Sequence, residues 1–259
     1  MRKVIFIYIF IILSQLTFAQ NNYVIEYKIF NNTNFPNIVN AKVLIDIQKG
    51  TTLYHPDFST KIKWSDKPKI VEDDSFFFEN QDEGTNFVEL NYNLKTVKSI
   101  EHLDKNKPIL ITDVFPELSW EITGRKETIS GYKAEEAKCS YRGREWIVWF
   151  TQEIPLPYGP WKLHGLPGLI LKATDKNEKY AFVLSTIRPQ VDNSIKDKFD
   201  TLKATSYKEM SLREFLILNN EYKDNFFKEL ASDRNVKIQT QEVPKSGYEL
   251  NYEWEADKK

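Results

Sequence analysis

Apolar and polar residues alternate with a period of two along most of the chain, which is the pattern of strands buried on one face. Between Tyr23 and Ile29 the odd-numbered residues are apolar, whereas Glu26 and Lys28 fall on the opposite face. Similar runs predict further strands at residues 42–48, 61–64, 75–78, 88–94, 109–113, 120–123, 134–141, 146–151, 169–173 and 180–187. Polar turn clusters separate these strands, so we expect an antiparallel meander rather than β-α-β units.

One C-terminal segment has helical spacing instead. From Ser211 onward, apolar residues recur every three to four positions, and Ser211 and Glu214 have the Ser-x-x-Glu spacing of a capping box. We predict a helix here, with the Asn219-Asn220 pair as a point where it bends or splits.

These elements predict one mainly β (β-rich α+β) domain that spans residues 20–259. Its expected architecture is a strongly curved antiparallel sheet or open barrel, with the C-terminal helix packed on the concave face or the mouth. This is analogous to the half-barrels of lipoprotein carriers, which enclose apolar ligands, although a shared fold does not define a function. We expect a long flexible connection at 187–203, and the alternation in "YELNYEWE" (248–255) predicts a last strand.

Residues 1–19 have the composition of a secretory signal peptide. A short basic start precedes an apolar run, and Thr17 and Ala19 place small side chains at the positions that a signal peptidase reads, so we expect cleavage before Gln20. The apolar run is short for a bilayer span and no second one follows, which predicts no stable membrane anchor after cleavage. We expect an exported protein in the periplasm, with the extracellular space as the alternative.

The net charge and the cysteine content exclude nucleic-acid binding and an internal disulfide. The mature chain has 34 Lys and Arg against 37 Asp and Glu, because the signal segment removes two basic residues and no acidic ones. This near-neutral balance lacks the basic footprint of nucleic-acid binding, so we exclude nucleic acid as a partner. The single cysteine, Cys139, cannot form an internal disulfide, and stability must come from core packing.

The stretch "GPWKLHGLPGLILKA" (159–173) concentrates glycine, proline, tryptophan and histidine before an apolar run. Prolines at 155, 157 and 160 remove backbone donors, so we expect an extended loop across the surface. The sequence Leu166-Pro167-Gly168-Leu169 fits a type II turn that leads into a buried strand. Upstream, Gly143 suits the turn of a hairpin between the strands at 134–141 and 146–151.

Reactive chemistry has weak support in the sequence. Cys139 lies within a predicted strand and is interpreted as a small apolar core residue. His55, His102 and His164 are far apart and form no metal-binding motif, and the acidic pairs at 72–74 and 82–84 lack the spacing of a calcium loop. We therefore predict no metal and no cofactor.

Recognition by shape is the better-supported hypothesis. Trp146 and Trp149 have opposite parity, so one faces the core and the other, taken as Trp149, faces outward. The predicted ligand- or partner-binding residues form an aromatic patch beside the Gly/Pro loop: Trp149, Tyr158, Trp161, His164, Gly165, Leu166, Pro167 and Gly168. The alternative is that these residues only seal the edge of the sheet.

The hexapeptide Gly165-Leu-Pro-Gly-Leu-Ile170 and its surroundings resemble the GLPGLI family of exported Bacteroidota proteins. The resemblance extends over Ile129–Leu171, includes "PELSWEIT" upstream and covers most of the mature chain. One departure is Lys133-Ala134, where family members often have a cysteine after the "GY". The family has no established activity, so the resemblance implies no catalytic residue.

Two hypotheses of function follow. The first is a non-enzymatic protein that binds an apolar ligand or an envelope partner, and it requires a pocket or groove without converging titratable groups. The second is an envelope hydrolase that uses His164 with a nearby carboxylate, and it requires a hydrogen-bonding partner for His164 in a cleft.

Overall fold

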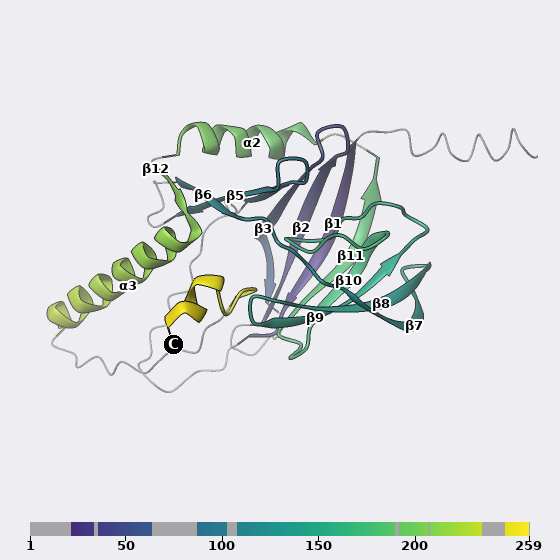
Figure 1. The fold of residues 1–259 in the computed structure, drawn as a ribbon. Helices are drawn as coiled ribbons and strands as arrows, with labels where there is room; N and C mark the ends of the chain where they lie inside the picture. Colours follow the sequence, from purple (N-terminus) through teal and green to yellow (C-terminus); the bar gives the residue numbers. More distant parts are fainter. Residues whose placement is uncertain are drawn as a thin grey trace, which may run out of the picture.

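The computed structural model describes residues 22–33, 36–63, 87–102, 108–189, 192–206, 208–234 and 247–258. They form a twelve-stranded open sheet with two α-helices and a terminal 3-10 helix (Figure 1). The strands are β1 (Asn22–Asn31), β2 (Asn37–Asp46), β3 (Thr51–Lys63), β4 (Phe87–Asn91), β5 (Thr96–His102), β6 (Pro108–Val114), β7 (Glu121–Ile129), β8 (Tyr132–Tyr141), β9 (Arg144–Thr151), β10 (Leu169–Asp175), β11 (Tyr180–Arg188) and β12 (Lys208–Ser211). The signal segment 1–19, the predicted strand 75–78 and both acidic pairs lie outside the described residues.

The sheet confirms the predicted fold class of a curved, β-rich architecture. Its strand order is β12-β6-β5-β4-β3-β2-β1-β11-β10-β9-β8-β7, and the sheet curls so strongly that β7, β8 and β9 turn toward the viewer in Figure 1. Neighbouring strands are antiparallel except for the short β12, which pairs in parallel with β6, Lys208 opposite Ile109. Five strands and a helix lie between β6 and β12 in the chain, so this parallel pair has the long connection that such a pair needs.

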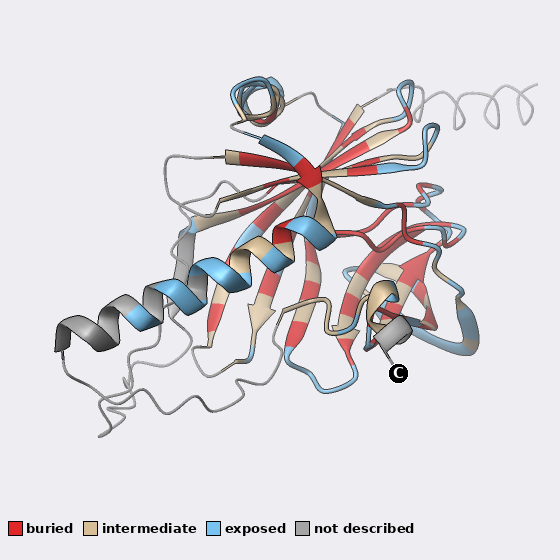
Figure 2. Ribbon diagram, turned by 60° about the vertical axis from the view of Figure 1, so that its left-hand side comes forward, coloured by how far each residue is buried: buried red, intermediate tan, exposed pale blue. Residues whose placement is uncertain are grey.

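Alternation along each strand separates two faces of the sheet. Tyr27 and Ile29 of β1 are buried on the face that we call the inner face, and the Tyr27 hydroxyl donates to the carbonyl of Ile170 at 2.7 Å. The main hydrophobic core includes both residues. The red bands of Figure 2 mark buried residues along the strands. Leu53 of β3 points to the opposite, outer face, whereas its neighbour Tyr54 joins the inner core.

Helix α2 (Asn193–Ala204) covers part of the outer face, where the sequence predicted a flexible connection. That prediction was wrong, because Ile195, Phe199 and Leu202 recur at helical spacing and pack on the outer face of β3 to β6. Phe199 is fully buried and stands 5.6 Å from the ring of Phe87. The hydrophobic gain of covering this face stabilises the helix despite its polar composition.

Helix α3 (Leu212–Arg234) confirms the predicted C-terminal helix and its capping box. The Ser211 hydroxyl accepts from the backbone N–H of Glu214 at 3.2 Å, and the Glu214 carboxylate accepts from the backbone N–H of Ser211 at 2.8 Å. The start of the helix packs on the sheet, through Phe215 against Ile109 and Ile111. The helix is continuous through Asn219-Asn220, and the residues directly after them whose burial is described, such as Glu221 and Tyr222, are exposed (Figure 2).

The C-terminal strap, as we call residues 247–258, is not the predicted last strand. The backbone N–H groups of Leu250 and Asn251 both donate to one carbonyl, that of Arg142, at 2.8 and 3.0 Å, and the chain ends in a 3-10 helix (Glu253–Lys258). Two neighbouring donors cannot share one acceptor in a strand ladder, which explains why the alternating pattern forms no strand. Among the described residues, no helix has the length and apolar character to cross a bilayer.

Candidate functional site

The Gly/Pro segment 152–168 folds onto the inner face instead of extending across the surface. Ile154, Leu156, Leu163 and Leu166 are buried in the main core, and we call this segment the plug loop. Although its prolines donate no hydrogen bonds, the other N–H groups find nearby carbonyls: Gly165 donates to Pro157 at 3.0 Å, Leu169 to Ile154 at 3.0 Å and Ile170 to Tyr158 at 3.1 Å. These internal bonds allow the loop to be buried.

The end of the plug loop differs from the predicted type II turn. Such a turn needs a positive φ at Gly168, but the positive φ values of the plug loop belong to Trp161, at +56°, and Gly165, at +91°. Gly168 is required for another reason, since a Cβ there would lie 1.9 Å from the carbonyl oxygen of Thr151. The predicted consequence is nevertheless confirmed, because Leu169, Ile170 and Leu171 are completely buried at the start of β10.

The structure does not assemble the predicted surface patch. Trp146 is buried and Trp149 is partly exposed on the outer face, as their parity predicted, with the Arg125 guanidinium 5.8 Å from the Trp149 ring. Tyr158 and Trp161 lie on the inner face, 9% and 6% exposed. Pro167 and Gly165 remain exposed, so the predicted binding residues divide between a core, a turn and the outer face.

His164 is buried among aromatic rings rather than paired with a carboxylate. Its Nδ1–H donates to the carbonyl of Lys162 at 2.9 Å, and its ring lies 5.2 Å from Tyr92 and 5.0 Å from Phe115. Burial lowers the pKa of the imidazole, and the charge of Lys95 adds to this effect against the hydrogen bond to Lys162. The ring therefore favours the neutral form.

A small open cavity of about 340 Å³ adjoins His164 and includes Glu117 and Ser119 in its wall. Within the described part of the chain, no carboxylate, hydroxyl or thiol hydrogen-bonds the His164 ring. The arrangement required for a His164-based hydrolase is therefore not formed by these residues.

A network of buried charges lies beside the plug loop. Its members are far apart in the sequence, and no local pattern predicts it. Arg142 binds Asp113 through two nitrogens, each at 2.8 Å, and reaches Glu249 at 2.9 Å. The Lys162 ammonium lies 2.7 Å from Asp113 and 2.6 Å from Glu249. The side chains of Arg142, Asp113 and Lys162 are only 2%, 4% and 7% exposed. Glu253, at the more open rim, accepts a further bond from Arg142 at 2.9 Å.

The network fixes the protonation of its members. Burial alone raises the pKa of Asp113, but the hydrogen bond and charge of Arg142 and the neighbouring Lys162 outweigh it and lower that pKa. Carboxylates that accept bonds from Arg142 likewise raise the pKa of its guanidinium above the ordinary value, against the opposing effect of burial. Asp113 and Arg142 are therefore both held in their charged forms near neutral pH.

An aromatic cradle receives the strap next to this network. We give this name to the rings of Trp146, Trp161, Tyr180 and Phe182, which surround Tyr248 with centroid distances of 6.3, 5.3, 5.0 and 5.2 Å. Trp161, a predicted binding residue, thus contacts the chain's own C-terminal segment.

A second ionic anchor holds the start of the strap. Arg144 pairs with Asp175 at 2.8 Å, and both side chains are almost completely buried. The Arg144 Nε–H donates to the carbonyl of Gly247 at 2.7 Å, while the Gly247 N–H donates to the Tyr180 hydroxyl at 3.0 Å. Strap and sheet are therefore connected at both sides of Tyr248.

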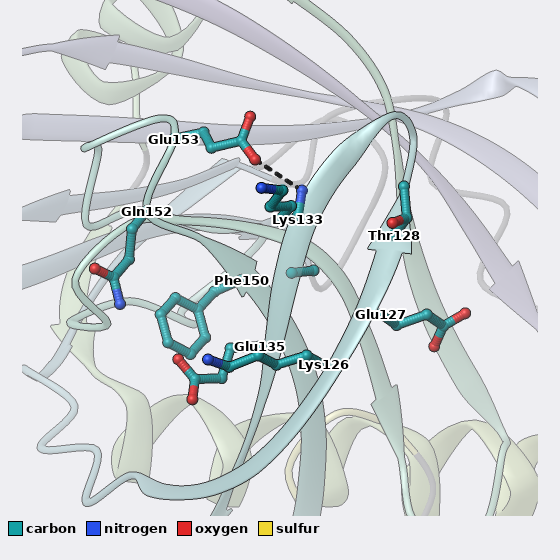
Figure 3. Close-up of a pocket in the computed structure, with 9 residues that line it drawn as sticks. Lys126, Glu127, Thr128, Lys133, Glu135, Phe150, Gln152 and Glu153 are labelled. Carbon is teal, nitrogen blue, oxygen red and sulfur yellow. Dashed lines mark hydrogen bonds between the residues drawn. The ribbon is translucent and has the colours of Figure 1, made fainter.

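An open groove of about 560 Å³ lies at the other end of the sheet, over the β7–β8 hairpin (Figure 3). Side chains of both charges line the groove, and Ala134 and Phe150 lie beneath them, almost completely buried. The carboxylate of Glu153 accepts from the backbone N–H of Lys133 at 2.9 Å, the dashed line in Figure 3. The groove adjoins the far edge of the sheet, because β7 is the terminal strand and its residues are mostly exposed.

A bulge shapes this edge. Between Ile122 and Lys126 the register of β7 against β8 shifts, and Arg125 and Thr123 both bind the buried carboxylate of Glu136. A bulged edge with charged side chains is protected against uncontrolled pairing with other strands. The register shift ends at Lys126, so Lys126, Glu127 and Thr128 form a regular, exposed part of β7 beside the groove.

The remaining candidates for reactive or metal-binding chemistry are Cys139 and the other histidines. Cys139 is 5% exposed, and burial raises the pKa of its thiol to about 12. The described residues contain no cluster of three His, Cys, Asp or Glu side chains that could hold a metal ion. His55 stacks on Phe87 at 4.2 Å, far from the plug loop in the sheet.

The comparisons with known proteins support the fold more than any activity. A family model described as "Protein of unknown function (Porph_ging)" matches residues 96–172, which include β5 to β9, the plug loop and the start of β10. No curated protein matches the sequence of the chain.

Among solved structures, two crystal forms of PNGF-II share 16% identity with the chain, with TM-scores of 0.51 and 0.50. The first similarity covers 78% of this chain and 34% of the PNGF-II chain, so the chain spans about a third of the length of that protein. At this identity the likeness concerns the fold alone. A LolA superfamily protein from Nitrosomonas europaea has a TM-score of 0.30 and 9% identity, over 69% of this chain and 90% of that chain, a similarity too low to support an argument.

Proposed function

We propose that this chain is an exported envelope protein of the GLPGLI type, resident in the periplasm, that works by binding a partner protein and not by chemistry of its own. The observation that carries the proposal is the open groove beside the accessible part of the terminal strand β7. The exposed lining of this groove is polar with side chains of both charges, which is the composition of the rim of a protein interface.

The partner is favoured over an apolar ligand because the inner face is already filled. The plug loop and Tyr248 occupy the position that a ligand would take inside a half-barrel. A partner at β7 needs no such space, since an extended segment can pair with the free backbone groups of an edge strand and place side chains in the adjacent groove.

Site-specific photocross-linking tests this proposal. We expect the mature chain with p-benzoyl-phenylalanine at Thr128 to cross-link one discrete partner in the periplasm of the native cells. The same probe at Lys179, an exposed residue of the β10–β11 turn, serves as the control. The charge reversals Lys126→Glu and Lys133→Glu in the groove should weaken the cross-link.

Equal cross-linking from Thr128 and Lys179, or a product insensitive to the groove charges, would refute the partner site. Native mass spectrometry of the purified protein separates the alternatives. A copurifying lipid or other small apolar molecule at stoichiometric level would favour the ligand hypothesis instead.

A further inference from the structure

The C-terminal strap resembles a bound peptide more than an element of the sheet. Its backbone contributes no strand ladder. Its contacts with the body include the Tyr248 ring, the Glu249 and Glu253 carboxylates, the Tyr252 and Trp254 rings beside Arg142, and backbone bonds at Gly247, Leu250 and Asn251. Glu253 remains 58% exposed although it binds Arg142. A segment held mainly by its aromatic side chains and carboxylates is a peptide-recognition arrangement.

The surface beneath the strap has the complementary chemistry. Without Glu249 and Glu253, the buried network would hold two cations, Arg142 and Lys162, against the single carboxylate of Asp113. The aromatic cradle lies beside these cations, because Trp161 is adjacent to Lys162 in sequence and its ring faces Tyr248. An acidic segment with an aromatic side chain satisfies both requirements.

Two buried polar groups of the surface beneath the strap lack a hydrogen-bond partner among the described residues. The indole N–H of Trp146, which is fully buried, and the hydroxyl of Tyr141, which is 8% exposed, have no hydrogen-bond partner among the described residues. Both rings border Trp161, with centroids 6.0 and 5.9 Å away. Buried polar groups of this kind are normally paired, so the strap is an incomplete match to the surface that it covers.

We propose that the aromatic cradle and the Arg142–Lys162 cations form a second binding site, for an extended acidic-aromatic segment of a partner protein, and that the strap is its displaceable intramolecular occupant. The segment recognised carries an aromatic side chain with carboxylates one and five residues later, as Tyr248, Glu249 and Glu253 do. This site is distinct from the β7 groove and does not depend on it.

Peptide binding to the full mature chain tests the proposal. The probe is a fluorescein-labelled synthetic peptide of residues 247–258, measured by anisotropy. A tethered strap competes at an effective concentration on the order of millimolar, so the wild type should bind the probe weakly. The double variant Tyr248→Ala, Glu249→Gln loosens the strap and should bind it at least about tenfold more tightly.

Matched controls separate this site from nonspecific binding. The variant Tyr222→Ala removes an exposed tyrosine from α3 and should behave as the wild type does. A probe peptide with Tyr248→Ala should not bind the loosened chain. Equal affinity of wild type and loosened variant, or no effect of the tyrosine in the probe, would overturn the proposal.

Two measurements on the wild type keep the test valid if the double variant folds poorly. The amides of Leu250 and Asn251 should exchange hydrogen at least about tenfold faster than those of β9, because the strap opens without global unfolding. Equal protection would make the strap a permanent part of the core and overturn the proposal. Sedimentation that reveals dimers formed through strap exchange would assign the site to a second copy and also overturn it.

Discussion

Arg142 and Asp113 join the two ends of the open sheet through a bidentate ion pair, with each terminal guanidinium nitrogen 2.8 Å from one carboxylate oxygen. Asp113 lies near the end of β6, the second strand of the sheet order, and Arg142 forms the turn between β8 and β9 near the other end. In a closed barrel, backbone hydrogen bonds between strands would join the two ends of the sheet. Here side chains connect them. Lys162 of the plug loop binds the same carboxylate and strengthens this connection.

Removal of the shared acceptor should therefore destabilise the protein strongly. The substitution Asp113→Asn keeps the shape of the side chain but removes the buried carboxylate that accepts from both Arg142 and Lys162. We expect a cost of about 3 kcal/mol or more. Urea unfolding measures this cost. The control Glu145→Gln breaks a more exposed pair with Lys176 and should change stability by about 1 kcal/mol or less. Similar effects of the two substitutions would show that the network does not hold the sheet together.

The pH dependence of stability should contain a contribution from His164. Because burial lowers the imidazole pKa in the folded state, folding favours the neutral ring. This stabilisation is complete above the unfolded value of about 6.5 and is lost as the pH falls through the lower folded pKa. We expect the wild type to lose more stability than His164→Asn between about pH 7.5 and pH 5.5.

Urea midpoints of both proteins across this pH range test the expectation. Comparing the difference between the two proteins cancels the contributions of His55 and His102, which are present in both. Parallel pH profiles would show that His164 titrates equally in the folded and unfolded states, contrary to its aromatic surroundings.

The sequence predicted those strands and helices whose pattern of apolar or capping residues is visible within the segment itself. Alternation identified β1 and the β8–β9 hairpin, and the capping residues Ser211 and Glu214 located the start of α3. Helix α2 was not predicted, although Ile195, Phe199 and Leu202 carry its apolar spacing, because the flanking polar residues obscured the pattern. Strand β3 was predicted only in its last part, since Pro56 interrupts its alternation.

The candidate sites depend on contacts that no local pattern encodes. Asp113, Arg142 and Glu249 come together only when the sheet curls, and their spacing in the sequence is unrelated to their distance in space. Similarly, the alternation of residues 248–255 has the appearance of a strand, but Tyr248 is placed by the aromatic cradle. Parity correctly separated Trp146 from Trp149, yet it could not show that Trp161 folds back onto the inner face.

Cys139 should be unreactive in the folded protein. Its thiol is buried and its pKa is raised to about 12, so almost no thiolate is present at pH 8. We expect labelling by Ellman's reagent to be slower in the native protein than in guanidinium by on the order of a thousandfold. The chain has a single cysteine, so the signal needs no deconvolution. Rapid labelling under native conditions would contradict the placement of Cys139 in the core.

Gly168 should tolerate substitution far less than Gly165, although both belong to the same hexapeptide. A Cβ at Gly168 would lie 1.9 Å from the carbonyl oxygen and 2.6 Å from the carbonyl carbon of Thr151, and backbone atoms cannot rotate away as a side chain can. At Gly165 the nearest atom is 3.9 Å away, and only the positive φ opposes a side chain. We expect Gly168→Ala to cost about 3 kcal/mol or more and Gly165→Ala about 1 kcal/mol, as measured by urea unfolding. Equal costs of the two substitutions would show that the close approach of Thr151 to Gly168 is not the reason for glycine at that position.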